Sequence, residues 1–406
     1  MHSEYSVFSA RLSGGIVLAA LAGAVLAAAP AGAAADPPSS ADLKKYLAAI
    51  ARTHADLDAG KIAEAQKRLE ATDKNLRSFE FEYARARAKA ATEGKAAPDL
   101  VHSLTSPGVE TRYGALNVET RKLAFICRDG GVRVYDLAAP AAEPKTAMHA
   151  EGGAIWSGAF SLDGRTFVAG HESGEAVVWD AADWKIRHTV TLSEKWPVRE
   201  IAIAPDGSAI VAESKTALEL WSLAGEKPKK IAEVGPRYNF GEGLAFSPTG
   251  DLIATGGMFD INLYDAKTGA PTGKIRHASY TMGLEFSPDG KRIASAPRGN
   301  VNKFLSVFDV ADAKSLFVAG PFPQYVAGMA FTSDGKRVVA TGPDMSVRLF
   351  DAATGEVMLN LKRAEHTAKP GVAANGRLIG WSEQSGFKYI DLDAKPPARI
   401  KGPIVP

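Results

Sequence analysis

A short apolar stretch ending in an aromatic or aliphatic residue, followed by a polar residue, recurs along this chain of 406 residues. The polar residue is Asp in every pair but one. The pairs are Tyr135-Asp136, Trp179-Asp180, Trp221-Ser222, Tyr264-Asp265, Phe308-Asp309, Phe350-Asp351 and Ile390-Asp391. Successive pairs are about 40 to 44 residues apart, which is the length of a repeat made of four short strands. The chain is therefore expected to be built from one structural unit used many times.

A tight turn precedes the pair in each of the later repeats. It has the form Ser-Pro-Asp-Gly or a variant of it, in which Pro fixes φ and Gly supplies a positive φ. The turns are Ser161–Gly164, Ala204–Gly207, Ser247–Gly250, Ser287–Gly290, Thr332–Gly335 and a weaker Ala373–Gly376. Short stretches with alternating apolar residues, such as Gly283–Phe286 and Leu305–Phe308, flank these turns and are typical of half-buried strands.

A single unit of four strands cannot bury both of its faces, so the units have to stack around an axis and close into a ring. We therefore predict an all-β fold, a seven-bladed β-propeller of four-stranded blades, over residues 98–406. Closing the ring requires an outer strand for the last blade. Leu100–Leu104 and Ala398–Ile404 both fit this role, and the sequence does not choose between them.

The repeats resemble those of WD40-repeat proteins in their period, their Ser-Pro-Asp-Gly turn and their aromatic–Asp strand end. The sequence also departs from that family. Only Trp179-Asp180 is a literal Trp-Asp pair, Arg276-His277 is the nearest match to the family's Gly-His dipeptide, and the Asp expected six residues before the aromatic remains as Asp129 and Asp344. The family's buried Asp-His-Ser-Trp hydrogen-bond network is therefore expected to be incomplete in most blades, which leaves packing to hold the ring. Repeats that depart from the WD40 pattern in this way resemble those of bacterial secreted or periplasmic propellers.

Residues 1–35 are predicted to be a secretory signal peptide. Arg11 lies in a polar n-region, Ile16–Ala29 is an uncharged apolar run, and Ala33–Ala35 suits cleavage. We expect a periplasmic or secreted protein without stable membrane insertion after cleavage. An uncleaved anchor in the inner membrane is the alternative, because Gly15–Ala35 is barely long enough to span a bilayer. Cys127 is the single cysteine of the chain, so an intramolecular disulfide is excluded.

Residues 36–97 are predicted to form a helical segment. Apolar residues recur at helical spacing from Leu43 to Ile50 and again from Ile62 to Leu69, separated by Asp58–Gly60. This pattern predicts a short α-helical hairpin and is similar to one tetratricopeptide-like hairpin, with a further Ala-rich stretch after it. Two or three helices bury little surface on their own. We therefore expect them to dock on the propeller or on a partner.

Charge argues against a nucleic-acid platform. The formal net charge is only +2, whereas such a platform requires a concentrated basic face. The run of Arg85, Arg87 and Lys89 is offset by Glu80 and Glu82 nearby. We expect no nucleic-acid partner.

Catalytic and cofactor motifs are missing from the sequence. One Cys excludes a Cys-x-x-Cys-His haem attachment, and the eight His residues are scattered along the chain. The sequence contains no Gly-x-Ser-x-Gly nucleophile elbow, no phosphate-binding loop and no dinucleotide fingerprint. We therefore predict a non-enzymatic protein with no metal and no cofactor.

Aligning the repeats on their turns places side chains of successive blades at equivalent positions where the chain enters the innermost strands. Aromatic residues, Arg and Met at such positions are the residue types that dominate protein interfaces. The predicted partner-binding face consists of Arg112, Trp156, Trp196, Arg199, Phe240, Glu242, Tyr280, Met282, Tyr325 and His366.

These observations favour a platform for protein–protein interactions outside the cytoplasm, with the helical segment as a second contact. The alternative is a ligand-binding or hydrolytic propeller, lactonase-like or peptidase-associated, with its site in the central channel. Glu242 and His366 are the only candidates for such a site, and they lie in different repeats.

Overall fold

The structure is a computed structural model of the whole chain. It describes residues 40–77, 79–93, 101–104, 111–117, 120–127, 129–138, 144–148, 152–194, 196–236, 243–277, 281–297, 304–322, 325–326, 328–342, 344, 346–362, 373–374, 378–383 and 386–391. The predicted signal peptide lies outside these residues. Within the described part, no helix is long and apolar enough to cross a membrane.

The N-terminal part forms three α-helices, which we call the helical bundle: α1 (Ser40–Asp58), α2 (Ile62–Glu70) and α3 (Phe79–Thr92). A short 3₁₀ helix, Lys74–Leu76, lies between α2 and α3. Gly60 takes a positive φ of 73° in the turn between α1 and α2, as the Asp58–Gly60 pattern indicated. The prediction of a hairpin was incomplete, because the Ala-rich stretch forms α3 and buries Phe81, Ala84 and Ala88.

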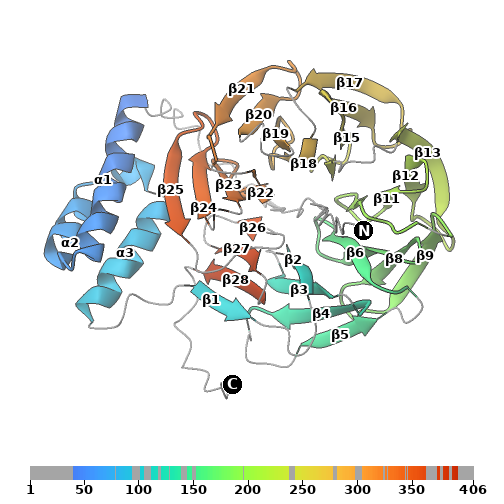
Figure 1. Cartoon of the computed structure of the whole chain (residues 1–406), viewed down its shortest axis with the longest axis horizontal. Coiled ribbons are helices and arrows are strands. Elements are labelled where there is room, and N and C mark those ends of the chain that lie inside the picture. The colour runs from blue at the N-terminus through green and yellow to red at the C-terminus, as the bar shows by residue number, and fades with distance from the viewer. Residues whose placement is uncertain are drawn as a thin grey trace, which may run out of the picture.

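The strands form seven four-stranded antiparallel sheets arranged as a ring (Figure 1). Six of these sheets each use four strands that follow one another along the chain. In chain order their bounds are β2 Thr111–Asn117, β3 Lys122–Cys127, β4 Gly131–Asp136, β5 Lys145–Met148; β6 Ile155–Phe160, β7 Thr166–His171, β8 Glu175–Asp180, β9 Ile186–Thr191; β10 Ile201–Ile203, β11 Ala209–Glu213, β12 Ala217–Ser222, β13 Lys229–Pro236; β14 Leu244–Phe246, β15 Leu252–Gly256, β16 Asp260–Asp265, β17 Pro271–Arg276; β18 Thr281–Phe286, β19 Arg292–Pro297, β20 Leu305–Asp309, β21 Ser315–Ala319; and β22 Gly328–Phe331, β23 Arg337–Gly342, β24 Ser346–Asp351, β25 Val357–Lys362. The first strand of each of these six sheets lies nearest the axis, and the prediction of an all-β propeller with four-stranded blades is confirmed.

The remaining sheet joins the two ends of the ring. It combines β26 (Ala373–Ala374), β27 (Leu378–Glu383) and β28 (Gly386–Asp391) with β1 (Val101–Leu104) from the start of the propeller. β1 runs antiparallel to β28, with Val101 opposite Ile390 and Leu104 opposite Phe387. Of the two closing strands that the sequence left open, the structure shows the N-terminal one in place, while residues 398–404 lie outside the described part.

The turns between the first two strands of a blade are held by their own side chains. The Ser161 hydroxyl donates to Asp163 Oδ1 at 2.6 Å and accepts from the Thr166 backbone N–H at 3.0 Å. Gly164 has the positive φ, 67°, that the motif predicts. The turn that begins at Ser287 repeats these contacts. The sequence motif therefore fixes the hairpin locally, before any contact between blades.

The helical bundle packs against the outer side of the blade formed by β22–β25 (Figure 1). Leu43, Ile50 and Phe81 of the helices belong to the same buried cluster as Met358 and Leu359 of β25. The expectation that the helices dock on the propeller is met by this shared core.

A buried polar contact accompanies that packing. Tyr46 Oη of α1 donates to Glu80 Oε1 of α3 at 3.0 Å, and Arg337 Nη2 of β23 donates to the same oxygen at 3.3 Å. The Glu80 side chain is 0% exposed and that of Arg337 9%. One carboxylate thus joins two helices and a blade.

Candidate interaction surface

The loops that lead into the innermost strands and the turns between second and third strands lie at one end of the channel. We call this end the entrance face. The described members of the predicted partner-binding set lie in these loops or in the innermost strands.

Trp156 and Arg199 come from neighbouring blades and are brought together. Trp156 lies in β6 and Arg199 in the loop before β10, and the guanidinium carbon lies 5.3 Å from the centre of the indole ring. Both side chains are half-buried, and the Arg199 backbone N–H donates to Glu213 Oε2 at 3.1 Å. This cation–π pair stabilises the junction between two blades, and the partner-binding role of Trp156 and Arg199 stays a prediction.

Trp196 is an exposed member of the predicted set, with 44% of its surface accessible. Its loop is fixed by hydrogen bonds: its backbone N–H donates to Ser193 Oγ at 3.1 Å, and the Leu192 and Ser193 N–H groups donate to the Gly174 carbonyl at 3.0 and 3.1 Å. A Cβ on Gly174 would lie 2.1 Å from the Ser193 carbonyl oxygen, so only glycine permits this close approach. The indole is therefore presented on an ordered loop.

The other predicted residues are only partly described. Tyr325 is half-buried in the loop before β22. Arg112 and Met282 belong to β2 and β18, but their side chains lie outside what the structure describes. Four more residues lie outside the described part altogether, and their placement stays a prediction: Phe240, Glu242, Tyr280 and His366. Both candidates for a channel site, Glu242 and His366, are among them.

Two exposed apolar side chains on the same face were missed by the sequence reasoning. Met258 and Phe259 occupy the turn between β15 and β16, and 52% of the Phe259 surface is accessible. The turn is closed by the Gly257 N–H, which donates to the Asp260 carbonyl at 2.8 Å, and the His277 N–H donates to the Phe259 carbonyl at 2.7 Å. The sequence did contain a signal for this turn, because Met258 occupies the position at which the repeat pattern expects Asp. Single exposed apolar residues are common on protein surfaces, but two adjacent ones form a small apolar patch that a partner can cover.

The family's Asp, where it survives, forms a local ion pair. Asp129 bonds Arg133, and Asp344 bonds Arg348, four residues further along in each case. The hydrogen bond from Arg133 lowers the pKa of Asp129 from its ordinary value of 3.8. These turns are thereby held on the entrance face by a charged pair rather than by a buried His.

One blade retains a fragment of the family's buried network. His277, in the loop before β18, has Nε2 3.2 Å from Ser295 Oγ and Nδ1 3.5 Å from Thr281 Oγ1. Its ring meets that of Phe308 edge-on at 5.6 Å, where the family has Trp. His277 is thus buried and structural.

Among the described residues, Cys127 and Glu285 are buried reactive side chains that belong to no metal-binding group. No group of three or more His, Cys, Asp or Glu side chains there is arranged to hold a metal ion. Cys127 is buried, and its thiol donates to the Phe125 carbonyl at 3.6 Å. Burial raises the pKa of Glu285 well above 4.5, on innermost strand β18. The equivalent residues of four other blades are Ala159, Ala202, Ala245 and Ala330.

The comparisons with known proteins agree with the fold. No established protein-family profile matches the chain. It is 24% identical over 259 residues to "Periodic tryptophan protein 2 homolog" of Dictyostelium discoideum, covering 62% of this chain and 27% of that protein. It is 25% identical over 142 residues to "WD repeat-containing protein SL1-17" of Schistosoma mansoni, covering 34% of this chain and 45% of that protein. The chain thus spans less than half the length of these relatives.

A solved structure shows the same architecture. The β-propeller domain of Cps50 (Swd1) from Myceliophteria thermophila superimposes with a TM-score of 0.60 at 15% sequence identity, covering 71% of this chain and 98% of that domain. Together with the repeat-protein relatives, this likeness supports the interpretation of the chain as a WD40-repeat β-propeller. The relatives are WD-repeat proteins, which agrees with the prediction that the chain is not an enzyme.

Proposed function

We propose that the chain is a non-enzymatic interaction platform that binds a protein partner on the entrance face, with Trp196 and Phe259 as its main described anchors. The observation that carries the proposal is the exposure of these two aromatic side chains on loops fixed by backbone hydrogen bonds. Such anchors bury a large area at little cost in conformational entropy, because the loops are already ordered.

The blade formed by β10–β13 lies between the two anchors, since Trp196 precedes β10 and Phe259 follows β15. A partner that covers both must therefore span an arc of the ring rather than fill the channel. Separate anchors favour an extended partner surface over a small ligand.

The test is site-specific photo-crosslinking in the native cell. A benzophenone amino acid is placed at Trp196 or Phe259, and a matched control places it at Val318, an exposed residue of outer strand β21. A discrete protein adduct at the first two positions, absent at Val318, is the expected result. Adducts at Val318 alone would move the interface to the outer strands and refute the proposal.

A second measurement separates binding from folding. Replacing Trp196 and Phe259 by Ala, in a chain without the crosslinker, is expected to abolish co-purification of the partner that crosslinking identified, since one such anchor typically contributes about 2 kcal/mol or more. The melting curve should move little, because substitutions at exposed positions usually change stability by about 0.5 kcal/mol or less. An unfolded double variant would show that these rings are core packing.

We also propose that this platform works outside the cytoplasm, after removal of residues 1–35. The support is the apolar run Ile16–Ala29 followed by Ala33–Ala35 in the sequence. Mass spectrometry of the protein from its native cells is expected to find an N-terminus near Asp36. An intact Met1 end would contradict the proposal.

A further inference from the structure

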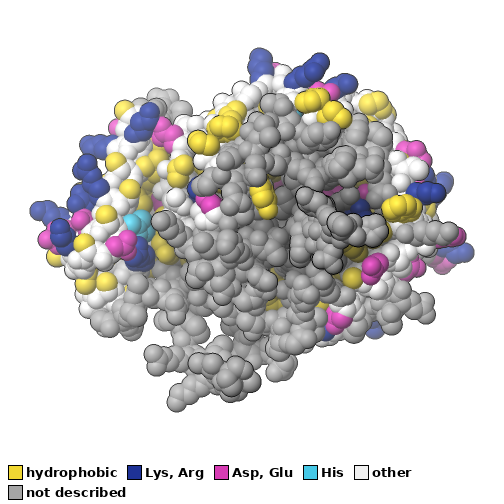
Figure 2. All heavy atoms as spheres, viewed as in Figure 1, with side chains coloured by type: hydrophobic (Ala, Val, Ile, Leu, Met, Phe, Trp, Pro, Cys, Tyr) yellow, Lys and Arg dark blue, Asp and Glu magenta, His cyan; other side chains and the backbone are white. Residues whose placement is uncertain are grey.

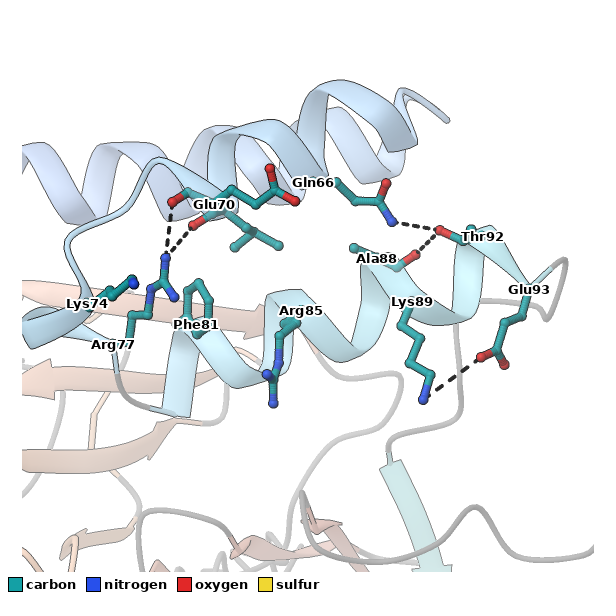
Figure 3. A pocket seen from close by; sticks show the side chains of 11 residues that line it. Gln66, Glu70, Lys74, Arg77, Phe81, Arg85, Ala88, Lys89, Thr92 and Glu93 are labelled. Carbon is teal, nitrogen blue, oxygen red and sulfur yellow. Dashed lines mark hydrogen bonds and ion pairs between the residues drawn. The ribbon is translucent and has the colours of Figure 1, made fainter.

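A groove of about 600 Å³ runs between α2 and α3 of the helical bundle (Figure 3). Its lining includes the apolar residues Leu69, Phe81 and Ala88, and polar residues from both helices surround them. All three apolar side chains are almost fully buried, so the apolar floor is narrow. Such a floor has room for a small side chain, and the polar rim offers most of the remaining contact.

Both ends of the groove are closed by hydrogen bonds between the helices. At one end Gln66 Nε2 donates to Thr92 Oγ1 at 3.0 Å, and Thr92 Oγ1 donates to the Ala88 carbonyl at 2.9 Å. At the other end Arg77 Nη2 donates to the carbonyls of Leu69 and Glu70, at 3.3 and 3.1 Å, where α2 ends. The groove therefore exists before any ligand arrives.

Arg77 has a structural role in this wall. Its guanidinium satisfies carbonyl groups at the C-terminus of α2, which have no partner within the helix. It also lies 4.4 Å from the centre of the Phe81 ring. This leaves Lys74, Arg85 and Lys89 as the cations available at the rim.

The rim carries an excess of positive charge. Four basic side chains and two carboxylates, Glu70 and Glu93, line the groove, and Glu82 outside it pairs with Arg85, so the basic side chains outnumber these carboxylates by one. The side chains of Arg85 and Lys89 are 64% and 79% exposed, and their pairs with Glu82 and Glu93 lie at the surface. Surface pairs of this kind contribute about 1 kcal/mol at most, so an incoming carboxylate can replace them. Figure 2 shows Lys and Arg side chains gathered on the outer side of the bundle.

The spacing of these cations suits one kind of ligand. Arg85 and Lys89 are four residues apart on α3, which places them about 6 Å apart along the helix axis. An extended peptide rises about 3.3 Å per residue, so carboxylates on alternate residues lie about 6.6 Å apart on one side of it. The side chains between them point to the opposite side of the peptide, so a small apolar side chain there can face the floor while the carboxylates face the rim.

We propose that this groove binds an acidic, extended peptide segment of a partner protein, with carboxylates on alternate residues facing Arg85 and Lys89 and a small apolar side chain on the floor. The site is separate from the entrance face, so the chain has two binding surfaces. Electrostatic attraction dominates the affinity, because the apolar floor is small. Binding therefore weakens as salt is added.

The experiment measures binding of a fluorescein-labelled peptide of alternating Glu and Ala residues to the full chain by fluorescence anisotropy. A peptide with Gln in place of Glu is the ligand control. Replacing Arg85 and Lys89 by Ala is expected to weaken binding of the Glu peptide about tenfold, from the loss of two charge contacts. Ala is the best helix former, so α3 should remain intact.

The matched protein control replaces Lys61 and Lys67 by Ala, which removes the same charge from exposed positions of the bundle outside the groove. This variant, and the variant lacking Trp196 and Phe259, are expected to bind the Glu peptide as the wild type does. Equal binding of the Gln peptide, no binding of either peptide, or equal losses in both charge variants would overturn the proposal. Vesicles containing phosphatidylserine that bind through Arg85 and Lys89 while the Glu peptide does not would show a membrane-facing site instead.

Discussion

The contact of Tyr46, Glu80 and Arg337 allows a sharp test of how the helical bundle is held on the propeller. We expect Glu80→Leu to destabilise the docking of the bundle strongly. The substitution keeps a side chain of similar size but removes the oxygen that accepts from both Tyr46 and Arg337. It also removes the carboxylate partner of a guanidinium that is 9% exposed.

The magnitude follows from the burial of the pair. Removing one partner of a buried ion pair typically costs about 3 to 5 kcal/mol, because the remaining charge stays buried without compensation. Arg337 also donates to the Lys336 carbonyl through Nη1, at 3.1 Å, which places the expected loss at about 3 kcal/mol, the lower end. Glu82→Ala is the matched control, since Glu82 lies two residues along the same helix and pairs with exposed Arg85. That control should cost about 1 kcal/mol or less.

Two spectroscopic signals separate the bundle from the ring. Among the described residues, the α-helices are confined to the bundle, so circular dichroism at 222 nm reports mainly on it. All six Trp residues lie between Trp156 and Trp381, so their fluorescence reports on the propeller. In urea, Glu80→Leu is expected to lose the helical signal well before the Trp signal.

A double variant distinguishes a missing partner from a poorly fitting Leu. Adding Arg337→Met should recover most of the lost stability, because no buried charge then remains at the contact. If Glu80→Leu unfolds within about 0.5 kcal/mol of the wild type, the buried contact does not hold the bundle. If the double variant is worse than either single one, packing rather than charge accounts for the loss.

Other changes follow from burial and pKa. Because the pKa of Glu285 is raised in the folded state, the protonated group contributes stability below about pH 4.5 that is lost as pH rises. Glu285→Gln should flatten this decline in melting temperature. An unchanged pH profile of the variant would refute the role of Glu285. Burial and the Arg87 guanidinium lower the pKa of His54 to about 4. The helical bundle, followed by circular dichroism at 222 nm, should therefore lose stability as pH falls from 6.5 to about 4. His54→Gln should reduce that loss. Leu104→Ala should cost about 2 to 3 kcal/mol by urea unfolding, since Leu104 is buried where β1 closes the ring, whereas exposed Leu316→Ala should change little.

The fold could be predicted from the sequence because the repeated turn motif forms its hydrogen bonds within itself. The hydrogen bonds of Ser161, Asp163 and Gly164 are local, so the turn motif specifies the same hairpin wherever it occurs. In the same way Asp265 Oδ1 accepts from the backbone N–H groups of Lys267 and Thr268, at 3.1 and 2.8 Å, in the turn that follows the aromatic–Asp pair. Local motifs of this kind are identified from spacing alone.

The functional surface was harder to predict because exposure depends on contacts between blades. Trp156 and Trp196 were both assigned to the same face from the sequence, but Trp156 is half-buried under Arg199 of the next blade, whereas Trp196 is exposed. Phe259 was missed because alignment on the first turn of each blade does not examine the second. The choice of closing strand was likewise open, since only the pairing of β1 with β28 decides it.

The loss of the family's buried network bears on how this surface can vary. The described entrance loops are fixed by several kinds of contact, among them the close approach at Gly174, the pair of Asp344 with Arg348, and the His277 hydrogen bonds. These contacts share no residues, so a substitution in one loop should leave the others in place. The exposed side chains can therefore change blade by blade without loss of the ring. If the entrance face binds a partner as proposed, its loops are free to specialise for that partner one blade at a time.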